Sequence, residues 1–486
     1  MSDPGPLVEE LVPTPDPLES CARCADLPFL LFLDSAGDSS HLGRHSFLAG
    51  DPPTAVRAKG RLTQQLVDGR WLRVAADPLA HARALLAPHA QAPIAGLPPF
   101  QGGVAGYVGY DWGATLERVP PARYDDLAVP DVLLGLYDWV IAWDHTAGRA
   151  WVISTGLPDT GAARSRRAAR RLAFVRERLE RAPRARAGEV AGRRPARSAR
   201  ATPSAPSYPV PEVPDVRSNF ARAGYLDAVA RVIEYIRAGD IFQANLSHRL
   251  EAPLDGTPLE LYRRLRTRNP APFAAFLDFG ELAVASSSPE RFLRVAPGGQ
   301  VETRPIKGTR PRGLGPEHDA ALALALAESE KDRAENVMIV DLLRNDLSRV
   351  CRPGTVRVPQ LFALEQYATV HHLVSTVVGE LEPEHDAVDL LRAAFPGGSI
   401  TGAPKVRAMQ IIAELEPTQR AVYCGAIGYL STSGALDTSV VIRTCLVRGR
   451  DVYFQVGGGI VADSDPEQEY RETLDKAGGL LAALAP

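Results

Sequence analysis

A carboxylate and an amine stand on two neighbouring short apolar runs of the sequence. Glu290 follows Pro289, and because proline restricts the backbone around it, Glu290 is expected at a turn. Lys307 lies between Ile306 and Gly308, where a glycine allows another group to approach the backbone closely. The apolar runs around both residues predict paired strands. An acid and an amine on paired strands can face one pocket, as acid–base or nucleophilic chemistry requires.

Three arginines near Lys307 leave two interpretations open. Together with Lys307, the side chains of Arg304, Arg310 and Arg312 are typical of a solvated basic face. Alternatively, the neighbouring cations, together with burial when substrate closes the site, disfavour the protonated ammonium and lower the pKa of Lys307, which would free its amine to act as a nucleophile. The spacing alone does not choose between them.

Two expected helices, over residues 331–350 and in the C-terminal segment, each carry a pair of carboxylates. Asp332 and Glu335 are three residues apart in the first, and Glu469 and Glu472 are three apart in the second. Residues at this spacing share one helical face. Each pair alone would be an ordinary solvated acidic face. Together the two pairs could surround one hard cation such as Mg2+, which prefers carboxylate oxygens and retained waters.

The strand expected over residues 241–252 alternates apolar and polar side chains. Its polar side chains Gln243, Asn245 and Ser247 share one face, which is either the solvent side of a sheet or the wall of a pocket. Nearer the C-terminus, Arg443 interrupts an apolar strand. The three glycines 457–459 that follow are expected to form an amide-rich loop.

The composition is typical of a soluble globular protein and argues against several classes of partner. The chain has 486 residues and a formal net charge of -3, so bulk electrostatics do not favour a nucleic-acid partner. No apolar run is long enough to span a bilayer, and the N-terminus lacks the basic start and apolar core of a secretory signal. The five cysteines fit a reducing compartment, so a cytoplasmic protein without a membrane partner is expected.

Composition divides the chain into three parts. Residues 1–182 carry several β-type runs and end in an arginine-rich amphipathic helix expected over residues 161–182. Residues 183–217 are rich in Pro, Arg and Ala with almost no large apolar side chains, which predicts a disordered linker. Residues 218–486 have a dense α/β pattern. A chain of this length is expected to form two lobes or one large composite domain.

Six blocks of the sequence, taken together and in order, resemble the chorismate-utilising enzyme family. The blocks are SSSPERFLRV, TRPIKGTRPRG, KDRAENVMIVDLLRNDL, FPGGSITGAPKVRAM, YCGAIGY and GGGIVADSDPEQEYRET. The region before the linker resembles the family more weakly, in GRHSFLAGDP and GYVGYDWG. The resemblance implies an α/β (α+β) fold in which two antiparallel sheets form a sandwich with helices outside. It also implies an active site between the sheets.

The resemblance further implies a role for each candidate residue. Glu335 and Glu472 would hold Mg2+, with support from Asp332 and Glu469, and the metal would bind the ring carboxylate of chorismate. Glu290 would be the general acid and base at the departing ring oxygen. The enolpyruvyl carboxylate of chorismate would be bound by Arg443, Tyr423 and the amides of Gly457, Gly458 and Gly459. The ring would be lined by Thr401 and His372.

Two positions distinguish the subfamilies. Where this chain has the segment PIKGT, anthranilate synthases have a segment similar to PIAGT, with alanine in place of lysine. Lys307 is therefore similar to the lysine with which aminodeoxychorismate synthases attack C2 of chorismate. Ammonia would then add at C4 and give 4-amino-4-deoxychorismate. Isochorismate and salicylate synthases are similar in sequence here but have, at the position of Gln243, a lysine that activates water as a base. Glutamine cannot be that base, so Gln243 is expected in a pocket wall. The alternatives are an anthranilate synthase and a non-catalytic chorismate-binding protein.

The sequence contains no Gly-x-Cys-x-Gly turn of the kind that carries a glutaminase nucleophile. The resemblance therefore implies that ammonia comes from a separate glutamine amidotransferase subunit or from solution.

Overall fold

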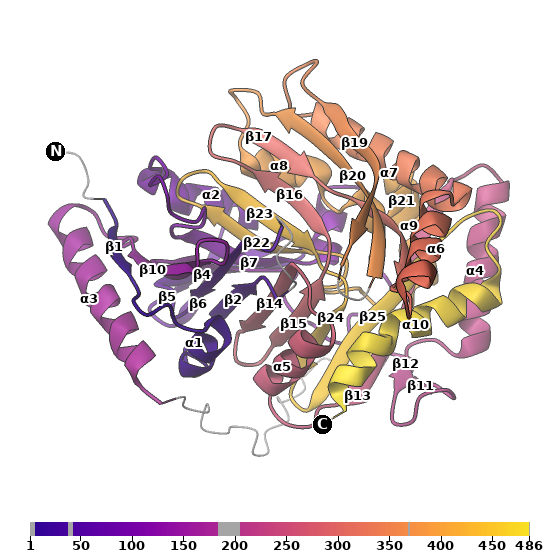
Figure 1. The fold of residues 1–486 in the computed structure, drawn as a ribbon, viewed down its shortest axis with the longest axis horizontal. Helices are drawn as coiled ribbons and strands as arrows, with labels where there is room; N and C mark the ends of the chain where they lie inside the picture. The colour runs from indigo at the N-terminus through magenta and orange to yellow at the C-terminus, as the bar shows by residue number, and fades with distance from the viewer. Residues whose placement is uncertain (1–4, 37–41, 183–204, 368–369, 486) are drawn as a thin grey trace.

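Two large antiparallel sheets face each other across a shared apolar core (Figure 1). The structure is a computed structural model, and the residues that it describes are 5–36, 42–182, 205–367 and 370–485. Leu31 and Phe47 of one sheet lie in the same cluster of buried side chains as Tyr107 and Leu133 of the other. The architecture is the expected sandwich of two antiparallel sheets, which is confirmed.

The first sheet contains 13 strands among the described residues. In spatial order they are β1 (Leu7–Glu10), β10 (Arg149–Ser154), β9 (Trp139–Asp144), β3 (His45–Ala49), β2 (Leu30–Asp34), β14 (Phe273–Asp278), β15 (Ala283–Ser288), β24 (Thr444–Arg448), β25 (Asp451–Ile460), β13 (Gln243–Pro253), β12 (Arg217–Ser218) and β11 (Tyr208–Pro209), with β21 (Gly402–Ala403) paired to β13.

The second sheet contains 12 strands within the same described ranges. In spatial order they are β18 (Ile306–Pro311), β20 (Val370–Glu380), β17 (Gln300–Thr303), β16 (Arg291–Val295), β23 (Leu436–Val440), β22 (Ala426–Ser431), β7 (Gly103–Val108), β8 (Val132–Tyr137), β4 (Thr54–Lys59), β5 (Leu62–Val67) and β6 (Arg70–Val74), with β19 (Arg357–Gln366) paired to β20.

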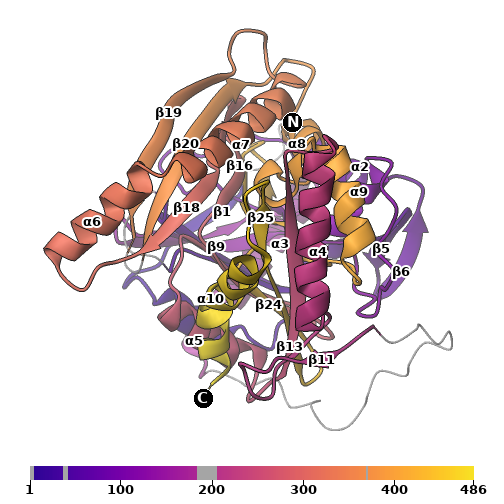
Figure 2. The ribbon, with the colours of Figure 1, turned by 90° about the vertical axis from the view of Figure 1, so that its right-hand side faces the viewer.

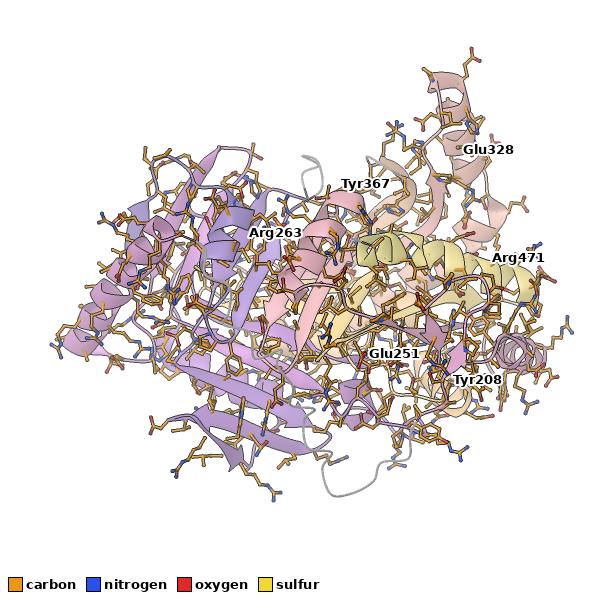
Figure 3. The ribbon with its side chains drawn as sticks, turned by 90° about the horizontal axis from the view of Figure 1, so that it is seen from below. Tyr208, Glu251, Arg263, Glu328, Tyr367 and Arg471 are labelled. Carbon is orange, nitrogen blue, oxygen red and sulfur yellow. The ribbon has the colours of Figure 1, made fainter. Side chains whose placement is uncertain are left out.

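Helices cover the outer faces of both sheets (Figures 1 and 2). Those on the first sheet are α1 (Pro17–Arg23), α3 (Gly161–Glu180), α5 (Pro258–Arg268) and α10 (Pro466–Leu484). Those on or beside the second sheet are α2 (Pro78–Leu86), α6 (Pro316–Ala327), α7 (Glu330–Ser348) and α8 (Ala387–Ala394), while α4 (Arg222–Arg237) and α9 (Lys405–Leu415) pack on β13. Three short 3-10 helices are η1 (Ala87–His89), η2 (Tyr110–Thr115) and η3 (Gly398–Ile400). Figure 3 shows Glu328, at the end of α6, far out from the body of the molecule.

The parts of the chain before and after residues 183–204 share both sheets. In the first sheet β2 pairs with β14, and in the second β7 pairs with β22. Every residue of β8 and β9 is buried, because a strand between the central core and an outer layer is covered on both faces. The two parts therefore form one continuous pair of sheets.

The structure describes only the last part of the expected linker, residues 205–217. Residues 183–204 lie outside the described residues. The remainder differs from the expectation, because Tyr208–Pro209 form β11, which pairs with β12. Val210 and Val216 are buried in the core cluster of the first sheet, and their apolar contacts hold this hairpin in place. The expectation of a disordered linker was therefore wrong for the segment that begins at Tyr208.

Helix α3 confirms the amphipathic helix expected over residues 161–182, and a buried carboxylate anchors it. Asp138 links β8 of the second sheet to β9 of the first, and its side chain is fully buried. It accepts hydrogen bonds from Nε of Arg167 at 2.7 Å and from Nε of Arg171 at 3.1 Å. A charge at this strand crossing is thus paired twice. Within the described ranges, no helix combines the length and the apolar character of a membrane span.

We expect Asp138→Ala to lower the free energy of unfolding by about 3 kcal/mol, because it leaves two partly buried guanidinium groups without their carboxylate. Urea denaturation monitored by circular dichroism measures this loss. Any activity of the chain under native conditions should stay near that of the parent protein, because Asp138 anchors a peripheral helix. An unchanged denaturation midpoint would contradict the anchoring role.

Candidate active site

Two neighbouring chain crossings between the sheets carry Glu290 and Arg443. Glu290 lies between β15 of the first sheet and β16 of the second, and Arg443 lies between β23 of the second sheet and β24 of the first. The Val440 amide donates to the Glu290 carbonyl at 3.0 Å, and the hydroxyl of Ser288 donates to the Val440 carbonyl at 2.6 Å. The Ser287 amide donates to the Arg443 carbonyl at 3.1 Å. The crossings therefore lie side by side, and they bring an acid and a guanidinium to the gap between the sheets.

Lys307 and Glu290 meet around one serine of η3. The pairing of β18 with β20 shifts register between Ile306 and Thr309, so Lys307 lies in a β-bulge, which re-aims a side chain relative to a regular strand. The Lys307 ammonium donates to the carbonyl of Ser399 at 3.1 Å, and the Ser399 hydroxyl bonds the Glu290 carboxyl. The expectation that an acid and an amine face one pocket is consistent with this arrangement.

Burial shifts the protonation of both groups toward neutrality. Burial raises the pKa of Glu290 to about 7, against the opposing effects of Ser399 and Lys307. Burial likewise lowers the pKa of Lys307, although the nearby carboxylates of Glu335 and Glu290 oppose the shift. A carboxylic acid beside a neutral amine is the matched pair that proton transfer with nucleophilic attack needs.

The arginines expected to lower the pKa of Lys307 are instead engaged with carboxylates. Arg304 pairs with Glu365, and Arg310 pairs with Asp332 at 3.0 Å. Because each guanidinium is neutralised by its partner, desolvation is the largest cause of the lowered pKa of Lys307. The expected direction agrees with the structure, and of the two expected causes burial is confirmed, whereas the arginines are not among the main causes.

The three glycines 457–459 belong to strand β25 and do not form the expected loop. Gly458 and Gly459 pair with Leu246 and Asn245 of β13. A Cβ atom at Gly457 would lie 2.5 Å from the carbonyl oxygen of Leu246, so this close strand pairing requires glycine. Glycine content alone indicated a loop, but here glycine serves close packing within a sheet.

The register of these strands nevertheless leaves two of the glycine amides free of β13. The amides of Asn245 and Ser247 donate away from β25, to the Thr401 carbonyl and to the Glu416 carboxylate. In an antiparallel pair, the opposing residues then also point their amides outward. These opposing residues are Gly459 and Gly457. On that side β24 pairs with β25 only as far as Phe454, so both amides face an open edge close to Arg443.

Carboxylates from α10 converge over the same glycines. A Cβ atom at Gly458 would lie 3.0 Å from Oε2 of Glu469, 3.7 Å from Nζ of Lys476 and 4.0 Å from Oε1 of Glu472. Glu469 is buried, whereas the side chain of Glu472 is 52% exposed, so the site opens to solvent along α10. Arg471, the neighbour of Glu472, lies on the outer side of this helix in Figure 3.

Glu335 of α7 reaches the site from the opposite side. A Cβ atom at Gly459 would lie 3.6 Å from Oε2 of Glu335 and 2.0 Å from Nε2 of Gln243. Glu335 has no hydrogen-bond or ion-pair partner within the part of the chain that the structure describes. Burial raises its pKa despite the attraction of Lys307 and Lys331. Gln243 is 1% exposed, and its Oε1 also lacks a protein partner, which fits the expected pocket wall.

The four carboxylates expected to bind Mg2+ are oxygen ligands of the type that a hard cation prefers, but lysine side chains lie among them. Glu472 pairs with Lys476 at 2.6 Å, and Lys331 lies 3.9 Å from Glu469. Asp332 is likewise paired, with Arg310, so Glu335 is the expected ligand whose carboxylate has no ion-pair partner among the described residues. Across the described ranges, no three side chains of His, Cys, Asp or Glu converge as a preformed metal site. The carboxylate oxygens of Glu335, Glu469 and Glu472 are nevertheless a donor set suited to Mg2+, which would compete with Lys476 for Glu472.

Of the groups expected around the ring and the enolpyruvyl carboxylate, His372, Thr401 and Tyr423 are buried and Arg443 is half-buried. Arg443 has a positive φ of 52°, and no carboxylate of the described residues lies within ion-pair distance of it. Burial lowers the pKa of Arg443, and burial together with Arg443 lowers the pKa of His372 to about 4. His372 bonds Thr309 through Nδ1 at 2.9 Å. An uncompensated guanidinium beside a neutral imidazole is suited to receive an anion.

Neighbouring protein groups hold the side chains of Tyr423 and Thr401 in place. The ring of Tyr423 is 9% exposed and lies 5.7 Å from the guanidinium carbon of Arg420. Thr401 is fully buried, and its hydroxyl donates to the carbonyl of Gly397 at 3.0 Å. Thr401 therefore shapes the loop at the site through its backbone as well as its side chain.

Sequence reasoning missed two residues that the structure places at the site. Lys476 pairs with Glu472 and donates to the carbonyl of Gly457 at 3.0 Å, and Ser399 connects Lys307 with Glu290. The only signal for Lys476 was its position four residues after Glu472 on one helical face. Ser399 lies in a glycine-rich turn, and its sequence context contains no comparable signal.

Comparisons with known proteins agree with the geometry. The family model described as chorismate binding enzyme matches residues 36–482. The chain is 42% identical over 463 residues to aminodeoxychorismate synthase component 1 of Salmonella typhimurium, covering 94% of this chain and 93% of that protein. It is 38% identical over 485 residues to anthranilate synthase component 1 of Pseudomonas aeruginosa, covering 98% and 94%. A solved structure of anthranilate synthase component I from Streptococcus pneumoniae superposes with a TM-score of 0.74 at 32% identity, covering 91% and 93%.

We expect Glu290→Gln to become more stable relative to the parent protein as pH rises. The folded protein holds the Glu290 proton up to about pH 7, whereas the unfolded chain releases it near its ordinary pKa of 4.5. The parent protein thus loses about 3 kcal/mol of stability from this group as pH rises through that window, and the neutral amide does not. Chemical denaturation of both proteins at pH 4.5 and pH 8 measures the difference. A pH-independent difference would show that Glu290 has an ordinary pKa.

Proposed function

Because the chain belongs to the family of chorismate-binding enzymes, we propose that it is an aminodeoxychorismate synthase component 1, converting chorismate and ammonia to 4-amino-4-deoxychorismate. The observation that carries this proposal is the buried Lys307 amine, which shares Ser399 with the Glu290 carboxyl. The identity to a relative of that name over nearly the whole chain supports it.

Chorismate would be held by its two carboxylates at opposite ends of the site. The enolpyruvyl carboxylate would bind the guanidinium of Arg443 and the outward amides of Gly457 and Gly459, since that charge has no partner among the described residues. The ring carboxylate would lie near Glu335 and Glu472. Mg2+ bound by these oxygens, with Glu469 and Asp332 nearby, would supply the positive charge that lets carboxylates face a carboxylate.

The remaining groups would fix the ring and exclude water. Tyr423 would lie beside the enolpyruvyl group, while Thr401 and His372 would line the ring. Gln243, with its unpartnered Oε1, would close the wall next to β25. Because Nδ1 of His372 bonds Thr309, the other ring nitrogen of the neutral imidazole would contact a ring hydroxyl without adding charge.

Lys307 and Glu290 would carry the covalent chemistry. The neutral Lys307 amine attacks C2, the ring double bonds shift, and the C4–oxygen bond breaks as Glu290 gives its proton to the departing hydroxyl, which leaves as water. Ammonia then attacks C4, the double bonds shift back, and the bond from C2 to Lys307 breaks. The nitrogen on C2 leaves as the neutral Lys307 amine, and the ammonium formed at C4 returns a proton to the Glu290 carboxylate, so both groups are restored and 4-amino-4-deoxychorismate is the product. The pKa directions of both groups favour the forms that this sequence needs.

Ammonia would come from a glutamine amidotransferase on a separate chain. The name component 1 of the similar proteins supports such a division of labour. The sequence of this chain carries no glutaminase nucleophile turn.

A second candidate is an anthranilate synthase, which would also eliminate pyruvate. The 38% identity to a protein of that name, over almost the whole chain, favours it. Anthranilate synthases have an alanine at the position that corresponds to Lys307, so the lysine found here favours the first proposal.

We expect the purified chain to convert chorismate with Mg2+ and an ammonium salt at alkaline pH to a product with the mass of 4-amino-4-deoxychorismate. Glutamine as the only nitrogen source should give no product, because this chain lacks the glutaminase. Chromatography with mass detection identifies the product. Anthranilate and pyruvate would establish the second candidate, and binding of chorismate without turnover would indicate a non-catalytic binding protein.

We expect Lys307→Ala to reduce kcat by at least ~10²-fold with little change in chorismate affinity, because a positioned reacting group is lost. Lys307→Arg is the matched control, since it keeps the positive charge and removes the nucleophile. Both variants should be inactive if the lysine reacts covalently, and only the alanine variant should be impaired if Lys307 is a charge contact. Mass spectrometry of parent enzyme quenched with chorismate, without ammonia, should show an adduct on the Lys307 peptide. Normal turnover by both variants would remove Lys307 from the mechanism.

A further inference from the structure

The segment between α9 and β22 carries a buried ion pair that the proposed chemistry does not use. The side chain of Arg420 is 1% exposed and that of Glu416 is 3% exposed. Nε of Arg420 donates to one carboxylate oxygen of Glu416 at 2.9 Å, and Nη2 donates to the other at 2.6 Å. This two-point geometry fixes the plane of the guanidinium.

The same guanidinium holds two backbone segments that line the candidate site. Nη1 donates to the carbonyl of Ile400 at 3.0 Å, directly before Thr401. Nη2 donates to the carbonyl of Asn245 at 2.6 Å, on the strand that carries Gln243. The Glu416 carboxylate completes the link, because it accepts from the amide and hydroxyl of Ser247 on that strand at 2.8 and 2.9 Å.

Two aromatic rings cover the guanidinium. Its central carbon lies 4.6 Å from the ring of Tyr110 and 5.7 Å from the ring of Tyr423. Tyr110 belongs to η2, in the part of the chain before residue 183, and Tyr423 is a candidate substrate contact. A guanidinium stacks on aromatic faces more readily than an ammonium does, so arginine is suited to join these rings to the backbone carbonyls.

We infer that Arg420, oriented by Glu416, is a positioning residue for chorismate binding: it fixes the Thr401 turn, the Gln243 strand and the Tyr423 ring relative to one another. This inference rests on the proposed roles of those three residues as substrate contacts. Arg420 itself is enclosed by protein and does not touch the substrate. A buried ion pair adds little stability over well-packed apolar side chains. The donors of one planar group instead satisfy acceptors from several segments at once.

The test compares chorismate affinity with stability in variants of the complete chain. Arg420→Lys keeps the charge and loses the planar fork. The double variant Glu416→Gln with Arg420→Met removes both charges at similar volume, so no charge stays buried alone. Asp138→Ala is the control for a buried ion pair far from the site, and Tyr110→Phe is the control for a hydroxyl that has no protein partner. Binding is measured by titration calorimetry with chorismate and Mg2+, and turnover by chorismate consumption.

We expect both Arg420 variants to fold, with KM and the dissociation constant for chorismate raised between about tenfold and a hundredfold, because small displacements of binding groups have effects of that size. The saturated rate should fall less, since the backbones of Lys307 on β18 and of Glu290 at the β15–β16 crossing make no contact with Arg420, although Ser399 lies next to Ile400. Asp138→Ala should lose stability with KM unchanged, and Tyr110→Phe should match the parent protein. An unchanged KM in folded Arg420 variants overturns the inference, because it leaves the pair a structural role only.

If the Arg420 variants do not fold, Glu416→Asp carries the same test, since it shortens the support of Arg420 by one methylene and keeps the charge. A raised KM supports the positioning role, and an unchanged KM in that folded variant overturns it. The measurement follows chorismate itself, so its outcome is independent of whether the product is aminodeoxychorismate or anthranilate. Failure of the proposed function and failure of this inference are therefore distinguishable.

Discussion

Strands that leave one sheet and enter the other create the polar positions on which this structure depends. At such a crossing the chain passes through the core, and any polar side chain there must find partners or remain unsatisfied. Asp138 occupies one crossing and is paired with Arg167 and Arg171. Glu290 occupies another, and its main partners are a serine hydroxyl and a lysine. The fold thus provides similar positions, one satisfied for stability and one left reactive.

The contrast between satisfied and unsatisfied charges extends through the site. Arg420 and Glu416 form a complete set of contacts, and so do Lys405 and Asp346, where the ammonium lies 2.6 Å from the carboxylate. Arg443 and Glu335 are also buried to a large extent, yet neither has an ion-pair partner among the described residues. Unpaired groups of opposite sign, held rigid by paired ones, form a site preorganised for a substrate with charges of its own.

The structure confirms the sandwich of two antiparallel sheets that the resemblance implied. It also confirms that Glu335 and Glu472 lie on helices and Lys307 on a strand, as local spacing predicted, while their roles remain proposals. The glycines of β25 were misassigned, since close approach of Leu246 and Gln243 requires them and no local pattern reveals that approach. Arg420 remained unnoticed because its contacts come from Asn245 and Ile400, distant in the chain. The roles of the β25 glycines and of Arg420 depend on contacts between elements that are distant in the sequence. The same is true of the carboxylates that neutralise the arginines around Lys307.

The pairing of β2 with β14 and of β7 with β22 has a consequence for synthesis of the chain. When the first part emerges from the ribosome, β2 and β7 are sheet edges with open hydrogen-bonding groups, and their neighbours arrive only with the later part. Exposed edges of this kind are templates for mispairing with other chains. Contacts between segments so far apart also close slowly. Translation speed and chaperone access during that interval should therefore govern the yield of folded enzyme more strongly than the stability of the finished protein does.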